Sequence, residues 1–160
     1  MNGRLTKLAI LCAAMLTAFA VIPAAAAATG PTTPELTSVR TGAHTTFDRV
    51  VLDLRGGRPE FFVRVVDRLI ADPSGKPVSL PGNHFLEVRL APAAAHDDNG
   101  NPTYTGARQF DTPSLSNVQA FAITGDSEAN LTVGLGARHT SWHRVFVLDA
   151  PTRVVIDVGH

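Results

Sequence analysis

The sequence predicts an all-β fold: a small β-sandwich of two mostly antiparallel sheets, preceded by a cleaved signal peptide. Three observations carry this prediction. Roughly eight to ten short β-type runs alternate with turn residues at intervals of about 8–12 residues. No stretch after the leader has the period of an amphipathic helix. A hexapeptide, Arg49–Leu54, also returns near the end of the chain as Arg153–Val158.

The repeated hexapeptide predicts how two strands pair. Alternation puts its second, fourth and sixth residues, all aliphatic, on a core face, and its Arg and Asp on the opposite face. With Val51 opposite Val155 in an antiparallel pair, Arg49 would face Asp157, and Asp53 would face the Arg of the other copy. A parallel pair in register would place like charges together. We therefore expect antiparallel neighbours, or equivalent positions in two separate sheets.

Residues 1–28 have the three-part layout of a secretory signal peptide. Arg4 and Lys7 supply the positive start, and residues 8–22 form an uncharged apolar run followed by several alanines. Because this run is shorter than the roughly 20 residues of a spanning helix, we expect cleavage and no membrane span afterwards. Residues 29–35 contain two prolines and are interpreted as a tether.

Composition narrows the class of protein. The sole cysteine, Cys12, lies in the leader, so the exported part must be held together by an ordinary core. The chain has 14 basic and 14 acidic residues, and removing the leader with Arg4 and Lys7 leaves an acidic excess. That balance argues against nucleic acid or an anionic membrane as the main partner. We expect one domain that is secreted or associated with the cell envelope.

Strands are expected in order along the chain, separated by turns. Asp72–Gly75 has the residues of a tight turn, and residues 91–117 have no clear period and form the longest loop. Phe61–Val66 is apolar on both sides, which predicts a strand covered on both faces. The expected strands are one opening at Val39, then Arg49–Leu54, Phe61–Val66, Leu69–Ile70, Val78–Leu80, Phe85–Leu90, Val118–Thr124, Leu131–Leu135, Arg144–Leu148 and Arg153–Val158.

Two longer blocks resemble a known family. Gly42–Arg49 contains Gly-x-His-x-x-Phe-Asp-Arg, and Pro102–Phe110 contains Pro-Thr-Tyr-x-Gly-x-Arg-x-Phe. Together with the closing segment Pro151–Val158, they make residues 36–160 similar to the secreted AMIN-like domains, relatives of the amidase N-terminal (AMIN) domain. The resemblance implies a sandwich of two small sheets. For AMIN domains proper, it implies a noncatalytic module that targets wall amidases and secretins through contact with peptidoglycan.

The leading functional hypothesis is an exported, noncatalytic binding module that contacts peptidoglycan or another wall glycan. The alternative is a protein-interaction domain that docks on an envelope enzyme. A small hydrolase is the least favoured hypothesis, because the sequence has no Gly-x-Ser-x-Gly elbow and no cysteine nucleophile after the leader. We therefore predict no catalytic residues and no cofactor.

Metal binding has little support in the sequence. His139 and His143 would lie about 13 Å apart on an extended strand, and two ligands fall short of a zinc site. Asp97, Asn99 and Asn101 form an oxygen-rich loop without the later bidentate Glu of a helix-loop-helix calcium site. They remain weak calcium candidates, and a turn in which Asx side chains bind their own backbone is favoured.

Aromatic residues and arginines are the better candidates for ligand binding. Tyr104 and Trp142 could stack on sugar rings, and the arginines could pair with stem-peptide carboxylates. Trp142, Arg144 and Phe146 share one face of a predicted strand, and are either an exposed patch or a core covered by residues 91–117. Burial is favoured, because sandwich proteins usually bury their only tryptophan. The candidate residues are Tyr104, Arg108, Trp142, Arg144, Arg49 and His44, of which His44 could equally fix a turn between strands.

Overall fold

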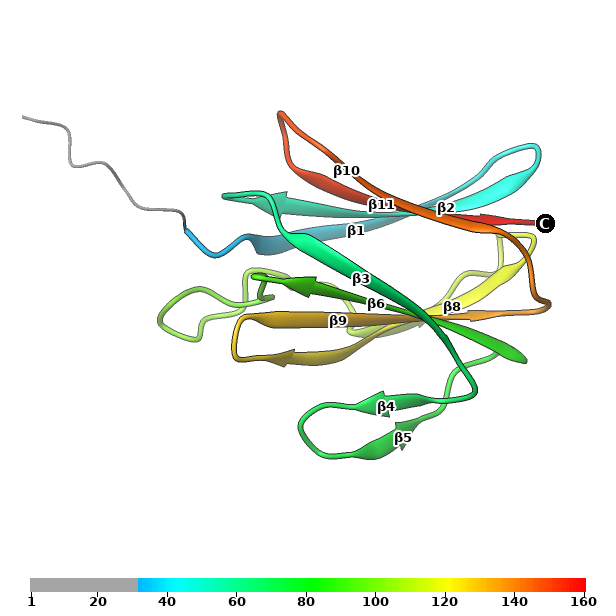
Figure 1. Cartoon of the computed structure of the whole chain (residues 1–160), viewed down its shortest axis with the longest axis horizontal. Coiled ribbons are helices and arrows are strands. Elements are labelled where there is room, and N and C mark those ends of the chain that lie inside the picture. The colour runs from blue at the N-terminus through cyan, green and yellow to red at the C-terminus, as the bar shows by residue number, and fades with distance from the viewer. Residues whose placement is uncertain (1–31) are drawn as a thin grey trace, which may run out of the picture.

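The computed structural model describes residues 32–160, so the predicted signal peptide and residues 29–31 of the predicted tether lie outside the described residues. Residues 32–160 form eleven strands and no helix, which confirms the predicted all-β class. Within this part of the chain, therefore, no helix is long and apolar enough to cross a membrane. One strand more than the ten expected is β7 (Gln109–Asp111), which lies within the segment predicted to be a loop. The strands form two main antiparallel sheets stacked on each other, with a separate hairpin on the far side of one sheet (Figure 1).

The first sheet has four strands in the order β1-β2-β11-β10. Its central pair consists of the two copies of the repeated hexapeptide, brought together from opposite ends of the chain. The strands are β1 (Glu35–Ala43), β2 (Phe47–Arg55), β11 (Arg153–Gly159) and β10 (His143–Leu148).

The second sheet has five strands in the order β3-β6-β9-β8-β7. A two-stranded hairpin, β4-β5, packs on its outer face and is joined by the predicted turn Asp72–Gly75. The strands are β3 (Glu60–Val66), β6 (His84–Ala91), β9 (Asn130–Ala137), β8 (Val118–Ser127) and β7 (Gln109–Asp111), with β4 (Leu69–Ala71) and β5 (Lys76–Val78) in the hairpin.

The register of β2 and β11 confirms the first of the two arrangements expected from the repeat. Val51 lies opposite Val155, Arg49 opposite Asp157 and Asp53 opposite Arg153, in antiparallel order. Of the two charged pairs, Arg49 and Asp157 form a side-chain ion pair, whereas Asp53 and Arg153 do not. Asp53 instead binds Arg40 of β1, which lies on its other side, with two N–O distances of 2.7 Å.

The core lies between the two sheets and follows the predicted alternation. The aliphatic positions of both hexapeptides are buried, as are Leu86, Val88 and Leu90 of β6. Phe121 of β8 is the largest fully buried side chain. These residues form one continuous cluster, which Tyr104 of the long loop joins.

Close packing on the outer face of the five-stranded sheet requires glycine at two positions. Gly134 and Gly136 lie on β9, where a side chain would overlap Leu69 and the carbonyl of Pro81, respectively. Their hydrogen side chains let the β4-β5 hairpin and the segment after it approach the sheet closely. Leu69 is fully buried there, in a second small cluster.

The prediction that Phe61–Val66 is covered on both faces is wrong. This segment is β3, the edge strand of the five-stranded sheet, and among the described strands it pairs only with β6. Phe62 is 54% exposed and Val65 is 63% exposed. An apolar run on both faces does not distinguish a strand inside a sheet from one at its edge, because that depends on which distant strand lies beside it.

Candidate functional site: an arginine–aromatic face

The outer face of the four-stranded sheet carries an ordered set of charged and aromatic side chains. Register places Arg49 of β2, Asp157 of β11 and Arg144 of β10 in one row across three strands. The neighbouring rows hold Phe47 and Trp142 on one side, and Phe146 on the other. We call this surface the arginine–aromatic face: Phe47, Arg49, Trp142, Arg144, Phe146 and Asp157, with His44 at its end.

Asp157 holds the two arginines in place. Its side chain is fully buried and accepts hydrogen bonds from Arg49 Nε (2.7 Å) and Nη2 (2.9 Å) and from Arg144 Nη2 (2.7 Å). Burial raises the pKa of Asp157, but the bonds from Arg49 and Arg144 outweigh this effect, and the pKa lies below its ordinary value. The carboxylate is therefore ionised at neutral pH, and one of the two guanidinium charges is left uncompensated.

Aromatic rings flank both guanidinium groups. Arg49 Cζ lies 5.2 Å from the ring centroid of Phe47 and 5.9 Å from that of Phe146. Arg144 Cζ lies 4.9 Å from the same Phe146 ring. These distances are within the range of cation–π attraction. The Arg144 side chain is 60% exposed, and the Asp157 bond uses only one of its five N–H groups, so the others can meet a ligand.

The aromatic end of the face is exposed. Trp142 is 52% exposed, with its ring centroid 6.0 Å from that of Phe47, and Phe47 in turn stacks on His44 at 4.4 Å. Gly159 lies between Phe47 and Trp142, and a methyl group there would overlap the indole Nε1. The indole therefore rests on bare backbone. The favoured prediction that Trp142 is buried under the long loop is wrong.

His44 fixes the turn considered for it, and its ring lies at the end of the aromatic row. Its backbone N–H donates to the Phe47 carbonyl at 2.9 Å and so closes the turn between β1 and β2. Its imidazole is exposed and extends the aromatic row. Four of the six candidate residues, His44, Arg49, Trp142 and Arg144, thus lie on one continuous surface.

Tyr104 and Arg108 lie elsewhere, in the loop before β7 of the other sheet. Tyr104 is only 9% exposed, packs in the core and donates its hydroxyl hydrogen to the Ala107 carbonyl at 3.0 Å. Burial raises the pKa of its phenol, and the charge of Arg108 partly offsets this shift. Arg108 pairs with Asp126 at 3.2 Å. Since the Tyr104 ring is enclosed, it offers no face on which a sugar could stack.

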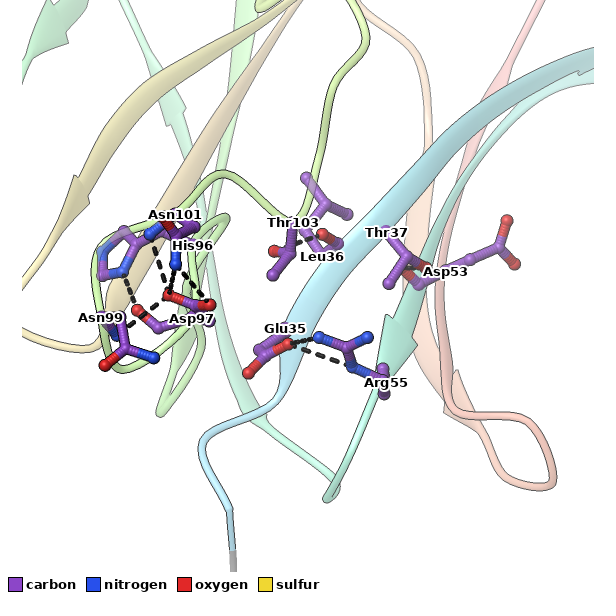
Figure 2. A network of polar contacts seen from close by, with 10 residues as sticks. All are labelled: Glu35, Leu36, Thr37, Asp53, Arg55, His96, Asp97, Asn99, Asn101 and Thr103. Atoms are coloured by element: carbon purple, nitrogen blue, oxygen red, sulfur yellow. Dashed lines mark hydrogen bonds and ion pairs between the residues drawn. The ribbon is translucent and has the colours of Figure 1, made fainter.

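Asp97 behaves as the turn residue that was favoured over a calcium ligand. Its Oδ1 accepts the backbone N–H of Asn99 at 2.9 Å and of Asn101 at 2.8 Å, and its Oδ2 accepts from Asn101 Nδ2 at 3.0 Å (Figure 2). The bonds from Asn101 lower the pKa of Asp97 most. Residues 32–160 contain no group of three or more His, Cys, Asp or Glu side chains that could hold a metal ion.

Asp48 is a structural residue whose role the sequence analysis missed. It is fully buried, and its carboxylate accepts the backbone N–H groups of Ser116 (3.0 Å), Asn117 (2.6 Å) and Val118 (2.9 Å), and a 3.1 Å contact from His160 Nε2. It therefore anchors the start of β8 to β2. Alternation already places Asp48 on the same face as the core residues of β2, and a buried carboxylate requires several donors.

Hollows on the described surface differ in size and position. The one between the ends of the two sheets, lined by His84, His139 and His143 among others, has a volume of about 40 Å³. That space fits about one or two water molecules. A larger hollow of about 450 Å³ lies over Phe62 and Arg89 beside β3.

Comparison with known families gives one match. A model of the AMIN-like domain matches residues 34–160, a span that includes every strand of both sheets. No curated protein and no solved structure matches the chain.

Proposed function

The chain belongs to the AMIN-like domain family, and from this premise we propose that it binds peptidoglycan or another wall glycan through the arginine–aromatic face. The family match supports the coarser description, a noncatalytic module associated with the cell envelope. Export by the leader at residues 1–28 and binding to the wall are the parts that we add.

The observation that carries the proposal is the exposure of Trp142 next to Arg144. Trp142 is the only tryptophan of the chain, and it lies half exposed near Phe47 instead of in the core between the sheets. Exposed indole rings with a polar edge are typical of recognition surfaces, because they give a large apolar contact at low entropic cost. The apolar face of a sugar ring fits such a surface.

The arginines supply a second contact, with the carboxylates of the ligand. Peptidoglycan carries carboxylates on its stem peptides, next to its sugars. A guanidinium group with free N–H donors pairs with a carboxylate in a geometry that lysine cannot match. Arg144 offers these donors beside the Trp142 ring, while buried Asp157 keeps its guanidinium from moving away. One ligand could therefore contact the ring and the cation together.

Electrostatics favours a modestly acidic ligand over a strongly charged polymer. Asp157 compensates one of the two arginines that bind it, and Asp53 compensates Arg40 on the same sheet. The face thus keeps a small positive excess rather than a basic stripe. A nucleic acid requires many phosphate contacts and a strongly positive surface. Isolated carboxylates of a wall polymer suit this arrangement better.

Retention on purified insoluble peptidoglycan tests the proposal. Trp142→Ala and Arg144→Ala should each raise the apparent dissociation constant about tenfold, the scale of a buried aromatic or arginine contact. Ile70→Ala is the control, because Ile70 is also an exposed apolar residue (39%) but lies on β4, away from the arginine–aromatic face. The control should be retained like the wild type.

Two results would contradict the proposal. Equal losses for Ile70→Ala and Trp142→Ala would mean that the arginine–aromatic face is not the binding surface. If the wild type is not retained at any salt concentration, a wall glycan is not the ligand, and docking on an envelope protein becomes the better hypothesis.

A further inference from the structure

The two main sheets of the described residues leave four edges, β1, β10, β3 and β7, which differ in how they are protected. β7 has only three residues, and β1 has a bulge between Leu36 and Ser38 and bridges to Ala94 of the long loop. Short strands and bulges are common devices against edge-to-edge pairing. β3 has neither device: all seven of its residues pair in continuous register with β6, and its other side has no neighbouring strand among residues 32–160.

The exposed side chains of β3 are unusual for an edge strand. Phe62 on the outer face is 54% exposed, and Val65 near the end of the strand is 63% exposed. Arg89 Cζ lies 5.0 Å from the centroid of the Phe62 ring, and Arg64 pairs with Glu87 of β6. The apolar and charged groups of β3 therefore lie side by side along an unpaired edge.

We propose that β3 binds a second copy of this chain by antiparallel edge-to-edge pairing, with Phe62 opposite the second copy's Phe62. In this register Glu60 faces the second copy's Arg64, and symmetry repeats this opposite-charge pair. Phe61 faces the second copy's Val63. Every pair formed by residues 60–64 is then either aromatic, apolar or of opposite charge, and the two five-stranded sheets become one continuous sheet.

Alternative pairings are less complementary. Shifting the axis to Val63 would place Glu60 opposite Val66 and Phe62 opposite Arg64, which leaves the acidic residue without a cation. The other long unprotected edge, β10, has the sequence His-Arg-Val-Phe-Val-Leu and contains no acidic residue, so a second copy could not balance its arginine. The charge pattern therefore singles out β3 and one register.

The hollow beside β3 supports the same partner. It has a volume of about 450 Å³ and is lined by side chains of β3 and β6, including Phe62, Arg64 and Arg89. The second copy's Phe62 would lie across this hollow, where aromatic and cation–π contacts with Phe62 and Arg89 are available. A dimer of this kind would also carry two arginine–aromatic faces, which strengthens binding to a polymer through avidity.

Cysteine cross-linking tests the register. In a chain that carries Cys12→Ser, so that the introduced cysteine is the only one, Phe62→Cys should form a disulfide-linked dimer under mild oxidation. Val65→Cys is the matched control, because Val65 is even more exposed but faces Pro59 of the second copy rather than itself. Cross-linking at Phe62 but not at Val65 is the expected result. Equal cross-linking at both positions would indicate random encounters and would overturn the proposed register.

Charge exchange tests the interaction without a covalent bond. Sedimentation of the wild type up to several hundred micromolar should show a reversible dimer, as expected for a small interface. Glu60→Arg places two arginines opposite each other and should weaken the dimer about tenfold or more, and Glu60→Arg with Arg64→Glu should restore it. Circular dichroism checks that each variant is folded. A wild type that stays monomeric and forms no Phe62→Cys cross-link would overturn the proposal, whatever the wall-retention assay shows.

Discussion

Replacing the buried carboxylate of Asp48 tests the structural account most sharply. In Asp48→Asn, the oxygen that remains can still accept two hydrogen bonds, but the new NH₂ group faces two donors among Ser116, Asn117, Val118 and His160. Each buried donor left without an acceptor costs about 1–3 kcal/mol. Allowing for partial relaxation, we expect a loss of about 2–4 kcal/mol in the free energy of unfolding, a large part of the total stability of such a domain.

Urea denaturation followed by circular dichroism measures this loss. With a slope of about 2 kcal/mol per molar urea, the middle of the usual range, the midpoint should fall by about 1–2 M. The matched control is Asp97→Asn, because Asp97 also accepts two backbone N–H groups but lies at the surface, where water can replace a lost bond. Its midpoint should stay within experimental error. Equal shifts for the two variants would refute the reasoning that burial sets the cost.

Acid should reduce the difference between the wild type and Asp48→Asn. Burial raises the pKa of Asp48, but the bonds from the Val118, Asn117 and Ser116 N–H groups and from His160 outweigh it, and the pKa lies below the ordinary value of 3.8. The stability that the carboxylate supplies is therefore complete above about pH 4 and is lost as the pH falls through the lowered pKa. A difference that stays constant down to low pH would contradict this assignment.

Three further substitutions have expected outcomes that thermal or urea unfolding can check. Asp157→Asn should cost about 2–4 kcal/mol, because it leaves two guanidinium groups without their buried partner, and a loss below about 0.5 kcal/mol would contradict that role. Gly134→Ala should cost about 1–3 kcal/mol, since the new methyl group would overlap fully buried Leu69, and an unchanged midpoint would mean that the hairpin does not pack there. Tyr104→Phe should cost about 0.5–1.5 kcal/mol through the lost bond to the Ala107 carbonyl, while wall retention stays unchanged.

Features encoded by local pattern could be predicted from the sequence. Alternation identified the core faces of β2, β6 and β11, because strand geometry fixes which side chains share a face. The repeated Arg and Asp argued against a parallel pair in register, since that order would stack like charges, and left antiparallel neighbours or two separate sheets. The structure has the first arrangement.

Features that depend on distant segments could not be predicted. Whether Trp142 is covered depends on the path of residues 91–117, and this loop packs Ala94 against the start of β1 instead of covering β10. The same loop encloses Tyr104, which removes one predicted ligand contact. Likewise, Asp53 pairs with Arg40 because β1 lies beside β2, and nothing in the repeat indicates that neighbour.

The most direct test of binding at the arginine–aromatic face uses the emission of Trp142 itself. Because Trp142 is the only tryptophan of the chain and is half exposed, its fluorescence reports on this face without a label. Titration with soluble peptidoglycan fragments should give a saturable blue shift and protect the indole from acrylamide quenching, and Arg144→Ala should weaken both effects. A chain that binds the insoluble wall while its tryptophan emission and quenching stay unchanged would contradict the proposed site.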